Sequence, residues 1–153
     1  MIADKIGVTK AAVYHQFNTK EEIVLAAAEE ELAWLEATID AAEQEDSSAG
    51  ARDALLSHIV TLAVERRRTT SIILNDPVIA RLFPENKTFR RVMARMNRML
   101  MGNDAGPDGQ IETAMLIAAI SGAAIHPLCV DLDDGRLRSQ LLHLARRFLG
   151  LPD

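Results

Sequence analysis

The first 23 residues constrain the fold of this chain more than any other part. They contain two short helical patterns separated by a tight turn. Ile2 and Ile6 lie on one face of the first helix, and Gly7 can take the positive φ that ends it. Thr9 suits the N-cap of the second helix, because its hydroxyl can accept from the exposed amides that follow. The segment therefore predicts a helix-turn-helix at the N-terminus.

The second helix of this motif has one apolar face and one polar face. Val13 and Phe17 lie four residues apart and face a core. Lysine, tyrosine and histidine side chains on the other face can grip phosphates, and second helices of this kind lie in the major groove of DNA. A third helix starts near residue 20, with Glu21 and Glu22 in its first turn, where the helix dipole favours acids. We predict that the DNA contacts come from Thr9, Lys10, Ala11, Ala12, Tyr14, His15 and Lys20.

The same run resembles the DNA-binding end of the tetracycline-repressor (TetR) family of bacterial transcriptional regulators. The matching residues are Ile2, Ala3, Gly7, Val8, Val13, Tyr14, Phe17 and Lys20, with Ile23 in place of the usual leucine. Gln16 departs from the aromatic residue found in many relatives. The resemblance implies an all-α protein, a homodimer on a palindromic DNA operator, and release by a small-molecule effector. It also implies a regulator that acts most often as a repressor.

Family members carry a further helix before this motif, which completes a three-helix DNA-binding module. We therefore expect an incomplete module over residues 1–23, followed by a helical ligand-binding and dimerisation bundle over residues 24–153. One hypothesis is that the natural chain extends upstream of Met1 and regulates transcription. The alternative is a helical ligand-binding or scaffold protein that has no DNA-binding activity because its N-terminal module is incomplete.

The composition agrees with a soluble regulator. The chain has 153 residues, 48% of them hydrophobic, and its only cysteine is Cys129. No apolar run reaches the roughly 18–20 residues of a membrane span, and no signal peptide opens the chain. We therefore expect a cytoplasmic protein with no membrane partner. The net charge is −5, yet residues 1–20 hold three lysines and one aspartate, whereas residues 21–46 hold ten acids and no base. This distribution predicts a basic tip on an acidic body, which would orient the encounter with DNA.

Beyond the tip, the apolar spacing predicts helices throughout. The first should run from about Lys20 to Glu43, with Ile23, Ala27, Leu32, Leu35 and Ile39 facing inward. The others are expected at Ala51–Arg68, Pro77–Leu82, Asn86–Met101, Gln110–Val130 and Arg136–Leu149. The segment NDAGPDG is predicted to be a loop, and His126-Pro127 to mark a kink or a helix end.

The last two predicted helices carry more apolar surface than one side of a helix can bury. Small residues at 114, 118, 119, 122 and 123 form one face, and an apolar seam with spacings of four, three and four forms another. An intrachain core would also use such surfaces. We favour a two-fold interface, because two heads are needed to read a palindromic site. The interface residues predicted are Ala118, Gly122, Leu137, Leu141, Leu144 and Phe148.

The middle of the chain is rich in isoleucine, phenylalanine and methionine. Methionine side chains adapt to irregular shapes, including those of bound molecules. The alternative is an ordinary packed core, and it is the family resemblance that favours a pocket for an apolar small-molecule effector. The ligand-binding residues predicted are His58, Leu62, Phe83, Phe89, Met93, Met96 and Ile120.

Other constellations do not predict chemistry. The four histidines lie far apart in the sequence without the spacing of a zinc site, and no nucleophile–base pair or phosphate loop stands out. We therefore expect no catalytic residues, no metal, no cofactor and no enzyme activity. Arginine clusters at residues 66–68 and 90–98 can contact phosphate, but solvated helix surfaces are the simpler reading. The acidic run at residues 29–31 is read as a solvated face.

Overall fold

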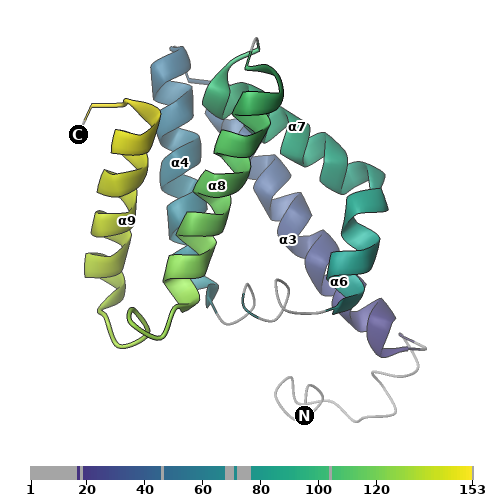
Figure 1. Ribbon diagram of the computed structural model, residues 1–153. Coiled ribbons are helices and arrows are strands. Elements are labelled where there is room, and N and C mark those ends of the chain that lie inside the picture. Colours follow the sequence, from purple (N-terminus) through teal and green to yellow (C-terminus); the bar gives the residue numbers. More distant parts are fainter. Residues whose placement is uncertain are drawn as a thin grey trace.

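The computed structural model describes residue 17 and residues 19–45, 47–67, 71, 77–103 and 105–152. Within these residues the chain forms six α-helices, one 3-10 turn and no strand (Figure 1). This confirms the all-α fold class. The elements are α3 (Lys20–Ala42), α4 (Ser48–Glu65), α6 (Pro77–Leu82), η1 (Phe83–Glu85), α7 (Lys87–Met101), α8 (Gly106–Ile125) and α9 (Asp134–Leu149).

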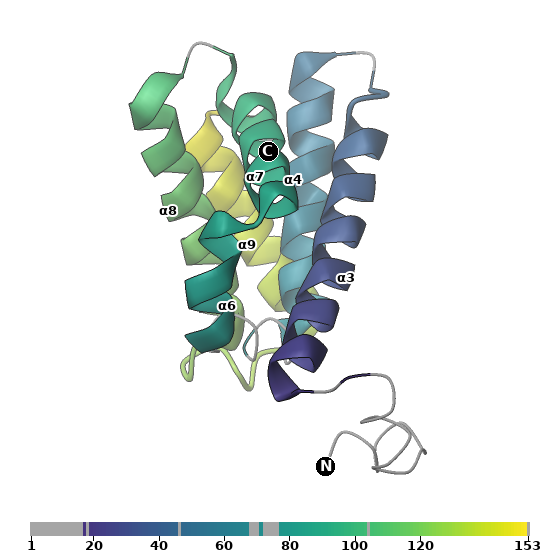
Figure 2. The ribbon, with the colours of Figure 1, turned by 90° about the vertical axis from the view of Figure 1, so that its right-hand side faces the viewer.

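Helix α4 lies at the centre of the bundle. It packs against α3, α7, α8 and α9, and its Leu55, Leu56, Val60 and Val64 are fully shielded from solvent. Figures 1 and 2 show that the first turn of α3, helix α6 and the loop between α8 and α9 lie at the same end of the bundle. The chain that precedes α3 therefore enters the bundle at this end.

Side-chain caps explain where four helices begin. Thr19 Oγ1 accepts from the Glu22 amide at 3.1 Å, and Ser47 Oγ accepts from the Gly50 amide at 3.0 Å. Asn86 Oδ1 does the same for α7 at 2.9 Å, and Asp133 Oδ1 for α9 at 3.1 Å. Each cap satisfies an amide that has no partner inside its helix. The Ser47 cap places the start of α4 three residues before the expected Ala51.

The bounds of α8 correct two expectations. The GPDG part of the predicted loop is helical, because Pro107 stands in the first turn, where its missing amide costs no hydrogen bond. The helix ends at Ile125 instead of Val130. His126 is extended, with φ −70° and ψ 139°, because a residue before proline is disfavoured in the α region. The expectation that His126-Pro127 marks a helix end is confirmed.

Helix α3 connects the N-terminal segment to the bundle. Leu32 and Ile39 are buried as expected, but Ala27 is exposed and its neighbour Ala28 takes the buried position. The winding of the helix places residue 28 on the same stripe as residues 32 and 39. The helix runs without interruption across residues 23 and 24, where the boundary between the two domains was predicted; that boundary stays a prediction.

Candidate functional site

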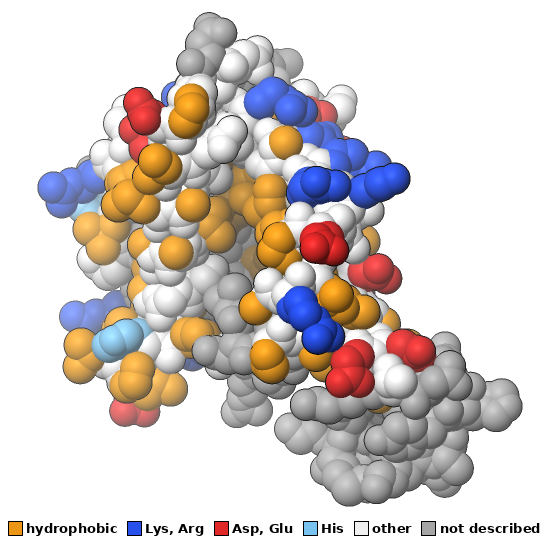
Figure 3. All heavy atoms as spheres, turned by 45° about the vertical axis from the view of Figure 1, so that its right-hand side comes forward, with side chains coloured by type: hydrophobic (Ala, Val, Ile, Leu, Met, Phe, Trp, Pro, Cys, Tyr) orange, Lys and Arg blue, Asp and Glu red, His pale blue; other side chains and the backbone are white. Residues whose placement is uncertain are grey.

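A cavity of about 140 Å³ lies between four helices. Figure 3 shows hydrophobic side chains gathered in a hollow on this face of the molecule. The lining comes from one residue of α3, three of α4, two of α7 and two of α8: Leu35, Ile59, Leu62, Ala63, Met93, Met96, Ile117 and Ser121. No charged side chain is among them. The described wall of the cavity is therefore largely apolar, and α3, α4, α7 and α8 all contribute to it.

The predicted ligand-binding residues divide into three groups. Leu62, Met93 and Met96 line the cavity. Ile120 is buried in the core without lining it, and Phe83 packs on Phe89 with ring centroids 5.0 Å apart. These three stay outside the cavity wall.

His58 was predicted to bind the ligand, but it is not among the residues that line the cavity. Its side chain is exposed, and its Nδ1 lies 2.8 Å from the carbonyl oxygen of Ala54, one turn earlier on α4. Sequence reasoning missed Ser121, which lines the cavity from α8. Ser121 stands four residues after Ile117, so a polar residue on an apolar stripe was the signal that would have found it.

A cluster of ion pairs joins α3 to α7, the helices that contribute Leu35, Met93 and Met96 to the cavity. Arg95 Nη2 lies 2.6 Å from Asp40 Oδ1 and 2.8 Å from Glu43 Oε2. Arg91 Nη2 lies 2.8 Å from Glu36 Oε1. We call these five residues the α3–α7 cluster. Hydrogen bonds to Asp40, the larger cause, and to Glu43 raise the pKa of the Arg95 guanidinium above its usual value, against the opposing effect of burial. Arg91 and Arg95 of α7 therefore form ion pairs with acidic residues at α3, which corrects the expectation that this arginine cluster is only a solvated surface.

Further ion pairs tie the other helices together. Arg146 of α9 binds Asp53 of α4 through both carboxylate oxygens, at 2.7 and 2.9 Å. This hydrogen bonding lowers the pKa of Asp53, although burial alone would raise it. Arg66 pairs with Glu31 of α3, and Arg67 pairs with Asp134 of α9. The expected solvated ends at Glu31, Arg66 and Arg67 are therefore corrected to contacts between helices.

Reversing the charge at Arg95 should lower the stability of the protein. Arg95→Glu places a fourth carboxylate beside Glu36, Asp40 and Glu43, so attraction becomes repulsion. We expect a loss of about 1–2 kcal/mol, since single exposed pairs contribute up to about 1 kcal/mol. Thermal unfolding followed by circular dichroism should show the midpoint lowered by about 3–6 °C.

Arg98→Glu is the matched control. Arg98 is exposed on the same helix and makes no ion pair within the described residues. It should lower the midpoint less than Arg95→Glu does, because it removes only the favourable interaction of a cation with the C-terminus of α7. High salt should reduce the difference between the unfolding midpoints of the two variants, because it screens partly exposed charges. Equal midpoints at low salt would show that the α3–α7 cluster does not hold the two helices together.

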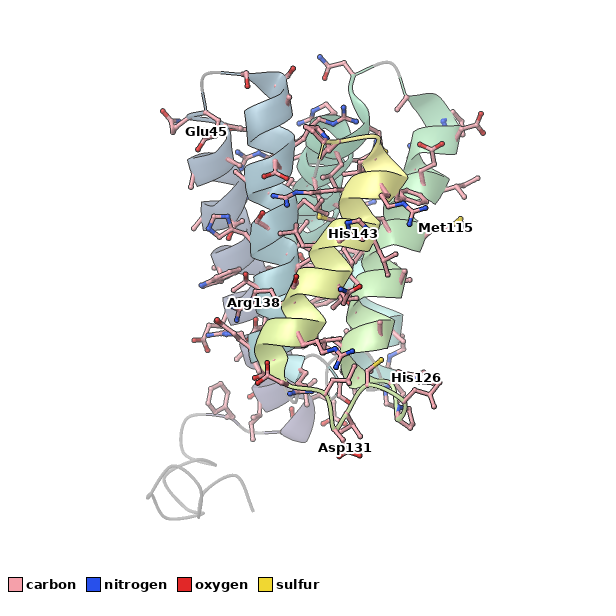
Figure 4. The ribbon with its side chains drawn as sticks, turned by 90° about the vertical axis from the view of Figure 1, so that its left-hand side faces the viewer. Glu45, Met115, His126, Asp131, Arg138 and His143 are labelled. Atoms are coloured by element: carbon pink, nitrogen blue, oxygen red, sulfur yellow. The ribbon has the colours of Figure 1, made fainter. Side chains whose placement is uncertain are left out.

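The outer faces of α8 and α9 carry exposed apolar side chains. Ile111, Met115, Ala118 and Gly122 follow one another on α8 at spacings of four, three and four, opposite its buried stripe. Ile111 and Met115 are each more than half exposed. Figure 4 shows Met115 pointing away from the bundle, with His126 and Asp131 in the loop between α8 and α9. This face has no partner within the described part of the chain.

Of the four apolar residues predicted to form an interface seam on α9, two are buried and two are exposed. Leu137 and Leu141 are only 3% and 8% exposed and belong to the intrachain core, whereas Leu144 and Phe148 are 55% and 46% exposed. The expectation of a single interface seam is corrected in this respect, because Leu137 and Leu141 have no free surface for a second subunit. Leu144 and Phe148 remain available to one.

The predicted DNA contacts cannot be placed in the same way. Thr9, Lys10, Ala11, Ala12, Tyr14 and His15 lie outside the described residues, and of Lys20 only its position at the start of α3 is described. Among the described residues, no three potential metal ligands lie together, and no helix is both long and apolar enough to cross a membrane.

Comparison with known proteins supports the resemblance seen in the sequence. Residues 1–27 match the family described as "Bacterial regulatory proteins, tetR family". The matched part contains every residue predicted to contact DNA and ends inside α3. No curated protein is similar enough to this chain to count as a match. The N-terminal segment thus resembles the TetR family, and the all-α fold agrees with it. At the general level, the match indicates a transcriptional regulator.

Proposed function

We propose that this protein is a homodimeric transcriptional repressor of the TetR type, which binds a palindromic DNA operator and is released from it by an apolar small molecule. The observation that carries the proposal is the continuity of α3. This helix begins inside the segment that matches the family, and its Leu35 lines the cavity. A cytoplasmic location follows from this function.

The geometry of α3 explains how effector and DNA would compete. Lys20 and Leu35 are fifteen residues apart on one helix, a distance of about 22 Å at 1.5 Å per residue. A ligand between α3, α4, α7 and α8 would shift α3 against its neighbours, and the N-terminal head would follow. The α3–α7 cluster resists this shift in the free protein. Release needs a ligand that prefers the shifted state, and a tenfold preference corresponds to roughly 1.4 kcal/mol.

The outer faces of α8 and α9 supply the surface for dimerisation in this proposal. Ile111 and Met115 are exposed on α8, which also carries the small residues Ala118 and Gly122, and Leu144 and Phe148 are exposed on α9. Small residues let two helices approach closely, while the larger side chains bury apolar area. Two heads held by such a dimer would fit half-sites about 34–36 Å apart.

Replacing Lys20 by alanine should reduce the salt dependence of DNA binding. Each phosphate contact that is lost makes the slope of log K against log salt shallower by about 0.9 on duplex DNA. Fluorescence anisotropy with a labelled duplex, selected from a random pool, measures the slope over a salt series. Lys87→Ala is the matched control, because Lys87 is the one lysine beyond residue 20 and lies on α7.

The outcomes separate the two hypotheses for this chain. A slope that stays the same in Lys20→Ala would remove Lys20 from the DNA contacts and leave the rest of the proposal standing. If the complete protein, with any sequence upstream of Met1 included, binds no duplex at any salt concentration, the regulator hypothesis is overturned. That result would favour the helical ligand-binding or scaffold protein instead.

A further inference from the structure

Among the described residues that line the cavity between α3, α4, α7 and α8, Ser121 is the one with a polar side chain. The other lining residues are leucine, isoleucine, alanine and methionine. Ser121 is half-buried and lies one turn after Ile117, so both face the same space from α8. The described part of the cavity wall is therefore apolar except at Ser121 on α8.

The hydroxyl of Ser121 makes no hydrogen bond to any residue that the structure describes. Serine inside a helix often donates to the carbonyl four residues earlier, and Ser121 does not. The two buried threonines behave differently. Thr38 Oγ1 donates to the Trp34 carbonyl at 3.1 Å, and Thr113 Oγ1 donates to Asn97 Oδ1 at 2.8 Å. Within the described part of the chain, Ser121 thus keeps both its donor and its acceptor capacity at the cavity wall.

The size and lining of the cavity limit what it can hold. Its volume of about 140 Å³ is enough for a molecule of about one ring, since an enclosed protein cavity of about 150 Å³ accommodates benzene; here the cavity is open to solvent on one side. A charged ligand would lose part of its hydration without meeting an opposite charge on the described part of the wall, which is unfavourable. A purely apolar ligand would leave the Ser121 hydroxyl without a partner.

We infer that the cavity takes an uncharged, mostly apolar molecule of about one ring in size, and that the Ser121 hydroxyl binds the single polar group of that molecule. This inference rests on the effector site proposed above and specifies its ligand class. Ser121 sets the orientation of the ligand, while Met93 and Met96 adapt to its apolar part.

Phenol and toluene form a matched pair of probes, because they are nearly equal in shape and differ by a hydroxyl against a methyl group. Binding to the full chain is followed by NMR of the methionine methyl groups. Met93 and Met96 line the cavity, and exposed Met115 reports any binding outside it. Dissociation constants of both probes are measured for the wild type and for Ser121→Ala. Ser139→Ala, at an exposed position on α9, serves as the control.

The preference for phenol over toluene should fall by about two- to tenfold in Ser121→Ala, the range that one net hydrogen bond supports. It should stay unchanged in Ser139→Ala. Ser121→Thr keeps the hydroxyl and should keep the preference, which guards against a general packing effect. Benzoate has a similar ring but a negative charge, so it should not shift the Met93 and Met96 signals.

Three results would overturn the inference. An equal preference in the wild type and Ser121→Ala would show that the hydroxyl is not the polar contact, while the binding of both probes would still support the effector site. Tight binding of benzoate would contradict the uncharged ligand class. Signals of Met93 and Met96 that move with neither neutral probe would overturn the inference together with the proposed effector site.

Discussion

Gly122→Arg should convert the proposed dimer into folded monomers. A Cβ atom added at Gly122 would have no described side chain or neighbouring element within 4 Å, so a larger side chain can leave the helix there without entering the intrachain core. In a packed two-fold interface the same arginine inserts bulk and an unpaired buried charge, which costs several kcal/mol. Sedimentation velocity at micromolar concentration should therefore show a monomer, and circular dichroism should show a helical content like that of the wild type.

Ala80→Arg is the control for the added charge. Ala80 is exposed on α6, away from the outer faces of α8 and α9. This variant should sediment like the wild type. A Gly122→Arg protein that still sediments as a dimer would place the interface elsewhere on the molecule. If dimerisation holds two heads on one operator, the monomer should also bind DNA about a hundredfold or more weakly, because the second head no longer acts at high effective concentration.

Leu55→Ala should destabilise the protein more than Leu62→Ala, although the two residues lie on the same helix. Leu55 is fully buried at the centre of the bundle, so its truncation removes contacts on all sides. A loss of about 2–5 kcal/mol is expected for such a position. Leu62 is half-buried and already borders the cavity, so its side chain makes fewer contacts. Leu62→Ala should therefore lower the free energy of unfolding by less than half as much as Leu55→Ala.

Urea unfolding at one fixed protomer concentration measures both variants, because the stability of a dimer depends on concentration. Leu62→Ala should also bind toluene at least as well as the wild type, since the change enlarges the cavity. Equal losses of stability for the two variants would indicate that the side chain of Leu62 is packed on all sides, and that the cavity is filled in solution.

Local sequence signals predicted most of the helices. His126-Pro127 ends α8 because a residue before proline avoids the helical conformation, which depends on no distant residue. Asn86 caps α7 for an equally local reason. The start of α8 was missed because two glycines and a proline are typical of loops. A proline in the first helical turn satisfies the same local rules as a proline in a loop, so the sequence does not distinguish the two.

The site depends on contacts between residues that are far apart in the chain. Arg95 and Asp40 are 55 residues apart, and Arg146 and Asp53 are 93 residues apart. Charge patterns showed an acidic segment and two basic clusters, but solvated surfaces explained them equally well. Only the packing of α3 against α7, and of α4 against α9, decided that these charges pair.

What the sequence determined by itself is the all-α class, most of the helix bounds and the resemblance of residues 1–27 to the TetR family. These follow from apolar periodicity, capping residues and a short motif, all of which act over a few residues. The tertiary structure decided which apolar stripe of α9 is buried. Leu137 and Leu141 meet neighbouring helices, while Leu144 and Phe148 remain exposed, although all four have the spacing of a core face. It also decided that Ser121, and not His58, faces the cavity. The physical reason is that a side chain is buried by the helices that pack around it, and those helices come together only when residues distant in the sequence make contact.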